Sequence, residues 1–164
     1  AQFASGAFDQ RSVEERNDVL VYTTPPLEQD VEVTGPVRLH LWAATTAVDT
    51  DFTGKVVDIA PDGYTQNLTD GIVRARYRLG TDKARPITPG EPTEYVIDLW
   101  ATSNLFKRGH RIALEVSSSN FPRFDRNLNT GHTLGEDAAM VPAIQTVYHD
   151  QNHPSRLILP IVPR

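Results

Sequence analysis

The sequence predicts an all-β domain, folded as a two-sheet sandwich of the jelly-roll type. Three observations support this fold class. Apolar and polar residues alternate in several short segments, turn residues separate these segments, and no segment shows the apolar period of a long amphipathic helix. About eight predicted strands suffice for a sandwich, and a jelly roll manages its sheet edges through long crossing connections.

The predicted strands run along the whole chain. The clearest is residues 37–42 (VRLHLW), where apolar residues alternate with period two after Gly35-Pro36. The others are residues 18–23, 53–60, 72–77, 94–100, 111–117, 145–148 and 156–161. Residues 103–106 are expected to form a helical turn. The residues expected to face the core are Val37, Leu39, Leu41, Ile97, Leu99, Ile112, Leu114 and Val116.

Composition limits the functions that the chain can have. Its 164 residues are enough for a single domain, 1–164, and the absence of cysteine excludes disulfides, thiolate metal sites and cysteine nucleophiles. The formal net charge is −5, without a concentrated basic face, so we expect no nucleic-acid binding. Arg74, Arg76 and Arg78 are interpreted as the polar face of a strand.

We also expect no membrane span, because no apolar run approaches the ~20 residues that a membrane helix needs. The chain shows no signal peptide, and its composition leaves cytoplasmic and secreted locations open. Because it begins Ala1-Gln2-Phe3 and its one methionine is Met140, we expect it to be part of a longer or processed polypeptide.

The sequence contains no serine nucleophile elbow. The G-x-S-x-G string of α/β-hydrolases is absent, and the nearest string, Gly131-His132-Thr133-Leu134-Gly135, has threonine in the serine position. This string lies in an irregular stretch, 118–143, without a strong strand before it. We therefore interpret it as a coincidence and expect no catalytic residue in this chain.

Metal and cofactor sites are weakly indicated, and none is predicted. His149 and His153 are four residues apart, but Pro154 and a neighbouring strand signal argue against the helix that would bring them together. Hard oxygen ligands for calcium are present in the set Asp49, Asp51, Asp58 and Asp62. The EF-hand pattern is absent, and acidic residues ahead of a strand more often cap loop backbone.

The segment 117–127 (SSSNFPRFDRN) concentrates two aromatic residues, two arginines and several small polar groups. One interpretation is a polar network in which Asn, Asp and Arg side chains hold the shape of an irregular loop. The other is a contact surface for a second domain, with Phe121 and Phe124 as its anchors. The residues alone leave both open.

Several strings of the chain, in this order and spacing, resemble one protein family. They are NDVLVYT (17–23), VEVTGP (31–36), DTDFT (49–53), PDG (61–63), DGIVR (70–74), ATSN (101–104), SSSNFPRFDRNLNTG (117–131) and HPSRL (153–157). The chain is similar to the C-terminal domain shared by X-Pro dipeptidyl-peptidases and cocaine esterase-like acyl hydrolases. These hydrolases include glutaryl-cephalosporin acylases and α-amino acid ester hydrolases.

The resemblance implies a galactose-binding-like jelly roll that packs on an α/β-hydrolase domain of the same polypeptide. In the family the Ser-Asp-His triad and the oxyanion hole belong to that hydrolase domain, so no catalytic residue carries over to this chain. Two other readings stay open. One is a carbohydrate-binding module with Trp42, Tyr64 or Trp100 as the sugar platform, and the other is a free-standing structural protein.

The expected domain interface lies where the densest family strings meet the ends of strands. Its candidate residues are Asp49, Asp51, Phe52, Phe121, Arg123, Phe124, Asp125 and Arg126. We expect an exposed apolar patch there, since the buried side of an obligate interface is more hydrophobic than ordinary surface. The competing expectation is that Asp51 or Asp125 pairs with Arg123 or Arg126 and merely fixes the loop.

Overall fold

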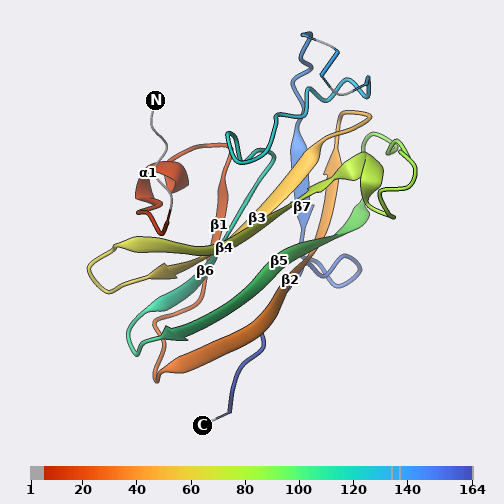
Figure 1. The fold of residues 1–164 in the computed structure, drawn as a ribbon. Coiled ribbons are helices and arrows are strands. Elements are labelled where there is room, and N and C mark those ends of the chain that lie inside the picture. Colours follow the sequence, from red (N-terminus) through yellow and green to blue (C-terminus); the bar gives the residue numbers. More distant parts are fainter. Residues whose placement is uncertain (1–5, 134, 137, 164) are drawn as a thin grey trace.

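Two antiparallel β-sheets form a sandwich in a computed structural model of the chain, which describes residues 6–133, 135–136 and 138–163 (Figure 1). The strands are β1 (Leu20–Thr23), β2 (Val31–Thr45), β3 (Asp51–Ile59), β4 (Thr65–Arg74), β5 (Thr93–Phe106), β6 (Arg111–Ser117), β7 (Gln145–Tyr148) and β8 (Arg156–Ile158). Helical structure in the described residues is limited to α1 (Arg11–Glu14) and a 3-10 turn, η1 (Ala75–Tyr77). None of these helices is long enough to span a membrane.

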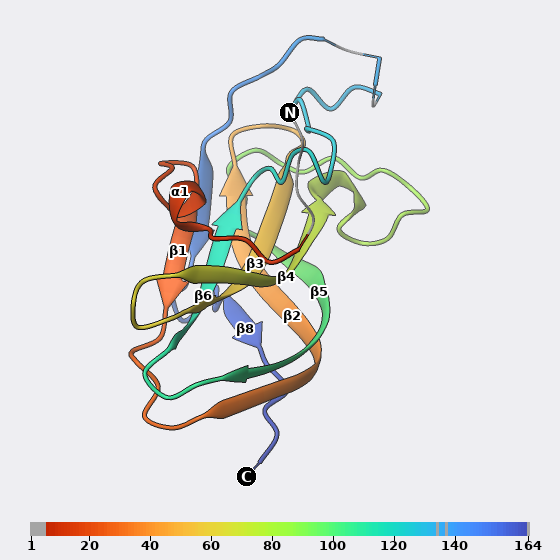
Figure 2. The same ribbon diagram turned by 60° about the vertical axis from the view of Figure 1, so that its left-hand side comes forward.

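The chain passes repeatedly from one sheet to the other. One sheet has the order β1-β6-β3-β4, and the other has the order β5-β2-β7, with β8 also paired to β2. Of the connections between successive strands, β3–β4 stays within one sheet as a hairpin and β7–β8 stays within the other, while β1–β2, β2–β3, β4–β5, β5–β6 and β6–β7 cross over (Figure 2). These crossings are what a jelly roll requires. The predicted all-β sandwich is confirmed.

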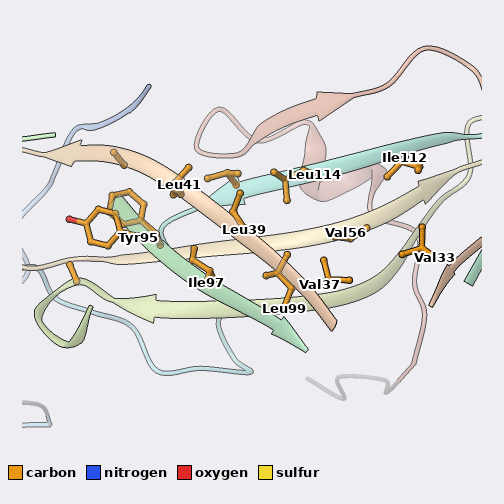
Figure 3. Packing of buried hydrophobic residues seen from close by; sticks show 14 of the residues in the cluster. Val33, Val37, Leu39, Leu41, Val56, Tyr95, Ile97, Leu99, Ile112 and Leu114 are labelled. Atoms are coloured by element: carbon orange, nitrogen blue, oxygen red, sulfur yellow. The ribbon is translucent and has the colours of Figure 1, made fainter. Parts of the chain in front are cut away.

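The core fills the space between the sheets. All eight residues expected to face it are buried, and Figure 3 shows most of them packed between β2, β5 and the opposite sheet. Phe52 and Tyr95 pack in the core with ring centroids 4.7 Å apart. The period-two pattern predicted these positions correctly, because alternate side chains of a strand point to the same face.

The sandwich is tightly closed along the edge where β4 meets β5. Gly71 on β4 approaches β5 so closely that a Cβ there would lie 2.1 Å from the carbonyl oxygen of Asp98. The Thr69 hydroxyl, also on β4, donates a hydrogen bond to the carbonyl oxygen of Leu99. Backbone of one sheet therefore touches backbone of the other at this edge.

β5 is longer than the sequence predicted, and the helical turn expected at residues 103–106 is wrong. These residues continue the strand by pairing with the start of β2, where Ser103 lies opposite Thr34 and Phe106 opposite Val31. A β-bulge precedes them: Val37 faces both Leu99 and Trp100, and Trp100 has a φ of 63°. Cross-strand pairing thus overrides the local preference, as is common in sheets.

The arginine-rich segment also differs from its prediction. β4 begins at Thr65, ends at Arg74, and gives way to η1, so Arg74, Arg76 and Arg78 do not line the polar face of one strand. Arg76 is buried, and Arg74 is nearly so. Both arginines pair with carboxylates, Arg74 with Asp51 and Arg76 with Asp49, so their charges can be buried. The sequence alone could not predict these partners.

A loop anchored by buried ion pairs

Two buried carboxylates lie where β2 ends and β3 begins. Asp49 accepts hydrogen bonds from the backbone N–H of Arg76, at 2.9 Å, and from its Nε, at 2.7 Å. Asp51 stands opposite Arg74 in the β3–β4 register and receives its Nε at 2.9 Å and its Nη2 at 3.0 Å. Each buried charge is therefore paired and hydrogen-bonded, the condition under which burial is tolerated.

The irregular loop that follows β6 is tied to this pair of carboxylates. The Asn127 amide donates to Asp49 Oδ2 and to Asp51 Oδ1, at 2.8 Å each. Arg74 Nη2 also reaches both carboxylate oxygens of Asp125 at 3.3 Å. Arg76 Nη1 donates to the carbonyl oxygen of His132 at 2.9 Å. We call residues 118–133 the anchored loop.

A second anchor holds the start of the anchored loop against β4. Asp70 accepts a hydrogen bond from the Asn120 amide at 2.8 Å and forms an ion pair with Arg123. These two contacts and those of Asn127 fix both halves of the segment around Phe121. The polar network that the sequence left open is therefore present.

The ion pairs expected from the sequence, between Asp51 or Asp125 and Arg123 or Arg126, are wrong. Asp51 and Asp125 both contact Arg74, whereas Arg123 contacts Asp70. Arg126 forms no ion pair within the described residues, and its guanidinium instead lies 4.7 Å from the centroid of the Phe121 ring. The register of β3 and β4 decides this, because it sets Arg74 directly opposite Asp51.

The three aromatic rings expected at the interface have different environments. Phe52 is 1% exposed, so the expected apolar surface at the Asp49–Phe52 turn is wrong: its ring is in the core, and both carboxylates are buried too. Phe124 is half-buried, with Arg123 5.5 Å from its ring centroid. Phe121 is 56% exposed. Phe121 is thus the ring that the anchored loop presents to the outside.

Sequence reasoning missed the residues that hold this loop, namely Arg74, Arg76, Asp70, Asn120 and Asn127. Asp49 and Arg76 are 27 positions apart, and Asn127 is 78 positions from Asp49. One available signal was the run of arginines placed where a strand meets a turn. Their partners depended on strand pairing, which a single sequence does not report.

The arrangement argues against the calcium site considered from the sequence. Asp49 and Asp51 are surrounded by guanidinium and amide N–H donors, which would repel a cation from their oxygens. Asp58 lies 2.8 Å from His110, on the far part of β3. Within the described ranges, no cluster of three or more His, Asp or Glu side chains is arranged to hold a metal ion.

The remaining candidates do not form a site. His153 packs between the rings of Trp42 and Tyr148, while the His149 ring contacts Tyr22. Leu134 of the Gly131–Gly135 string lies outside the described residues. The three aromatic residues considered for sugar binding are dispersed. Trp42 lies opposite Glu94, and Glu94 is six residues from Trp100 along β5, so the two tryptophans are ~20 Å apart. Tyr64 is in the β3–β4 turn of the other sheet.

Comparison with known proteins identifies the family of this domain. Residues 1–158 match the family described as the X-Pro dipeptidyl-peptidase C-terminal non-catalytic domain. The chain belongs to this family. The resemblance expected from the sequence strings is confirmed, whereas the galactose-binding-like relationship stays a prediction.

Relatives of the domain are hydrolases. The chain is 48% identical over 162 residues to a cocaine esterase from Rhodococcus sp. (strain MB1 Bresler), covering 98% of this chain and 28% of the esterase. Two solved structures are also similar. An aminopeptidase from the marine sediment archaeon Thaumarchaeota archaeon has a TM-score of 0.86 and 34% identity, over 96% of this chain and 28% of its own. An α-amino acid ester hydrolase has a TM-score of 0.89 and 31% identity, over 95% and 27%.

The chain therefore spans little more than a quarter of the length of the relatives that it matches. In the family description this part is non-catalytic. Both facts agree with the absence of a G-x-S-x-G string from the sequence.

Proposed function

We propose that residues 1–164 form a single accessory domain of a serine hydrolase and pack on the α/β-hydrolase domain of the same polypeptide. The anchored loop is the contact surface, with Phe121 as its apolar anchor and Arg126 beside it. The observation that carries the proposal is a phenylalanine ring held 56% exposed on a loop that is fixed on both sides by hydrogen bonds to the buried carboxylates of Asp70 and Asp51.

The rigidity of the loop favours binding. An exposed aromatic ring on a mobile loop would lose conformational freedom on docking, which subtracts from affinity. Here Asn127, Asp70 and Arg74 already hold the backbone around Phe121 in place. Buried aromatic residues and arginines are also the side chains that most often contribute the binding energy of an interface. Phe121 is such an aromatic residue, and Arg126 is such an arginine.

The buried candidates have a supporting role in this proposal. Asp49 and Asp51 are buried within the domain and hold Asn127, while Phe52 anchors the start of β3 in the core. Arg123, Phe124 and Asp125 border Phe121 along the loop. The parent's reaction belongs to its hydrolase domain, where the resemblance to esterases and peptidases implies acyl transfer from an ester or amide to water by a serine nucleophile.

The test is Phe121→Ala in the full-length hydrolase and in the isolated chain. In the full-length protein we expect this change to weaken domain packing by about 2 kcal/mol, the size typical of an interface anchor. The thermal midpoint should fall there, while the isolated chain unfolds as before. Tyr64→Ala is the control, because Tyr64 is an exposed ring in the β3–β4 turn, at the opposite end of β3.

Equal effects of Phe121→Ala and Tyr64→Ala on the full-length protein would contradict the proposal. So would a fall in stability of the isolated chain as large as that of the full-length protein, because Phe121 would then support the domain itself.

A further inference from the structure

The two long edges of the sandwich differ. β4 and β5 touch through backbone at one edge, where Ile97 and Leu99 of β5 are fully buried. At the other edge, the sheet ending in β1 stands apart from the sheet ending in β7 and β8. A cavity of about 500 Å³ opens between them, with walls from β1, β2, β6, β7 and the segment around β8.

Inward-facing side chains are left uncovered along β1. Leu20 lies opposite Val116 and Tyr22 opposite Leu114, and directly paired residues point to the same face of a sheet. Val116 and Leu114 are core residues, so Leu20 and Tyr22 also face the interior of the sandwich. They are nevertheless 45% and 37% exposed.

The inward-facing side chains of β7 and β8, on the opposite wall of the cavity, are also incompletely buried. Val147 of β7 pairs with buried Ala43, and Leu157 of β8 pairs with buried Leu39, yet Val147 and Leu157 are only half-buried. A second cavity of about 400 Å³ adjoins the first, sharing Val116 and Val147, and continues to Ala143. We call the two cavities together the open-edge groove. A ring contact between Tyr22 and His149 crosses it, with centroids 6.0 Å apart.

Edge strands border this groove. In the described part of the chain, β1 pairs only with β6, and its other edge presents backbone N–H and C=O groups without a partner strand. An exposed strand edge beside an apolar surface is what an added β-strand recognises. Backbone hydrogen bonds supply affinity, and alternate side chains fill the apolar space.

We propose that the open-edge groove receives an extended segment of the same polypeptide, which pairs with β1 and places alternate apolar side chains between the sheets. Phe121 does not line the open-edge groove, although Ser118, Ser119 and Asn129 of the anchored loop border its second cavity. The inference rests on the proposed function only in taking the segment from the longer polypeptide. That source is favoured because the relatives are between three and four times as long as the part they share with this chain. A covalently linked segment also acts at high effective concentration.

A second copy of the chain fits the groove less well. Through its own β1 it would offer four residues, Leu20–Thr23, whereas the groove extends from Thr24 at one end to Ala143 at the other. The inward-facing side chains of that β1 already point into the groove of their own copy. The side chains of a strand from elsewhere in the polypeptide would be free to enter this groove.

Hydrogen exchange of the β1 amides tests the inference directly. We expect residues 20–23 to exchange about tenfold or more slowly in the full-length protein than in the isolated chain, because pairing at the free edge protects them. The protection should persist in the full-length Phe121→Ala variant, since the Phe121 side chain does not line the open-edge groove. An unchanged thermal midpoint of the full-length Phe121→Ala variant, with β1 still protected, would contradict the loop interface and leave the inference about the added strand intact.

Substitution of Tyr22 provides the second arm. Tyr22→Lys puts a charge into the groove and should lower the thermal midpoint of the full-length protein and abolish the protection of β1. In the isolated chain, where Tyr22 borders an open groove, it should leave the circular dichroism spectrum unchanged and lower the unfolding midpoint less than in the full-length protein. Tyr64→Lys is the matched control, since Tyr64 is 38% exposed against 37% for Tyr22.

Three results would overturn the inference. The first is equal β1 exchange in the isolated chain and the full-length protein. The second is a Tyr22→Lys effect no larger than that of Tyr64→Lys in the full-length protein. The third is a concentration-dependent dimer of the isolated chain, seen by sedimentation, in which β1 becomes protected, because the occupant would then be a second copy.

Discussion

Asp51 and Arg74 lie directly opposite each other on β3 and β4 and form a two-pronged ion pair, with contacts of 2.9 and 3.0 Å. The hydrogen bonds that Arg74 donates to Asp51 raise the pKa of Arg74 above its ordinary value, although burial opposes this. The same two side chains reach Asn127 and Asp125 of the anchored loop. Strand register at the end of the sheet therefore determines where the loop lies.

Removing the anion from this pair should be costly. Asp51→Asn leaves the nearly buried Arg74 without its main partner and is expected to destabilise the isolated chain by about 3 kcal/mol. Asp18→Asn breaks the pair between Arg16 and Asp18, whose side chains are both more than half exposed, and should change stability by less than about 1 kcal/mol. Urea unfolding followed by tryptophan fluorescence measures both. Similar losses in the two variants would show that the buried pair is not an anchor.

The closed edge of the sandwich depends on a glycine. Gly71→Ala would put a Cβ 2.1 Å from the carbonyl oxygen of Asp98, and backbone can yield only by separating the sheets. Gly54 lies opposite Gly71, and a Cβ there would meet side-chain atoms of Leu39 at 2.8 Å and Leu99 at 3.2 Å. We expect a loss of about 3 kcal/mol or more for Gly71→Ala and a smaller one for Gly54→Ala. Unfolding midpoints in urea provide the comparison, and the reverse order would contradict it.

A buried carboxyl group on β6 should make stability depend on pH. Glu115 is 4% exposed, and burial raises its pKa above the ordinary 4.5, against the opposing charge of Lys55 at 3.1 Å. Burial, and then the charge of Glu115, also raise the pKa of Glu14 on α1. Because the pKa values of Glu14 and Glu115 are raised in the folded state, that state binds more protons than the unfolded state above pH 4.5. The free energy of unfolding should therefore fall as pH rises from 4.5 through the raised pKa values.

The double variant Glu14→Gln and Glu115→Gln tests this origin. It should flatten the fall in stability between pH 4.5 and about 6, before histidines titrate. Asp9, Asp18 and Asp150 have lowered pKa values, so their contributions are lost only below pH 3.8 and act in a separate range. An unchanged slope in the double variant, measured by urea unfolding at several pH values, would assign the effect to other groups.

The isolated chain should be inactive toward p-nitrophenyl esters and X-Pro amides. Its sequence has no serine elbow, so there is no nucleophile for a base and oxyanion donors to activate. Release of p-nitrophenol or p-nitroaniline is the measurement. Turnover by the purified chain that a serine-directed inhibitor abolishes would contradict this prediction.

Local patterns were sufficient for the inner face of the sandwich. The alternation in residues 37–42 and 111–117 identified Leu39, Leu41, Ile112 and Leu114 as core residues, and each is buried. A strand's side chains alternate whatever the strand pairs with, so this information is present in a few consecutive residues. Where pairing decided the outcome, local patterns failed, as at residues 103–106, which pair with β2 instead of forming a turn.

By itself, the sequence determined that this protein is an all-β sandwich of a recognisable family, that it has no serine elbow, and which residues face its core. The tertiary structure alone decided that Arg74 and Arg76 pair with Asp51 and Asp49, that Phe121 is exposed while Phe52 is buried, and that one edge of the sandwich is closed and the other open. The physical reason is the separation along the sequence of the residues that interact. Strand alternation arises between neighbouring residues, whereas ion pairs and sheet edges depend on contacts between segments tens of residues apart, which register and packing establish.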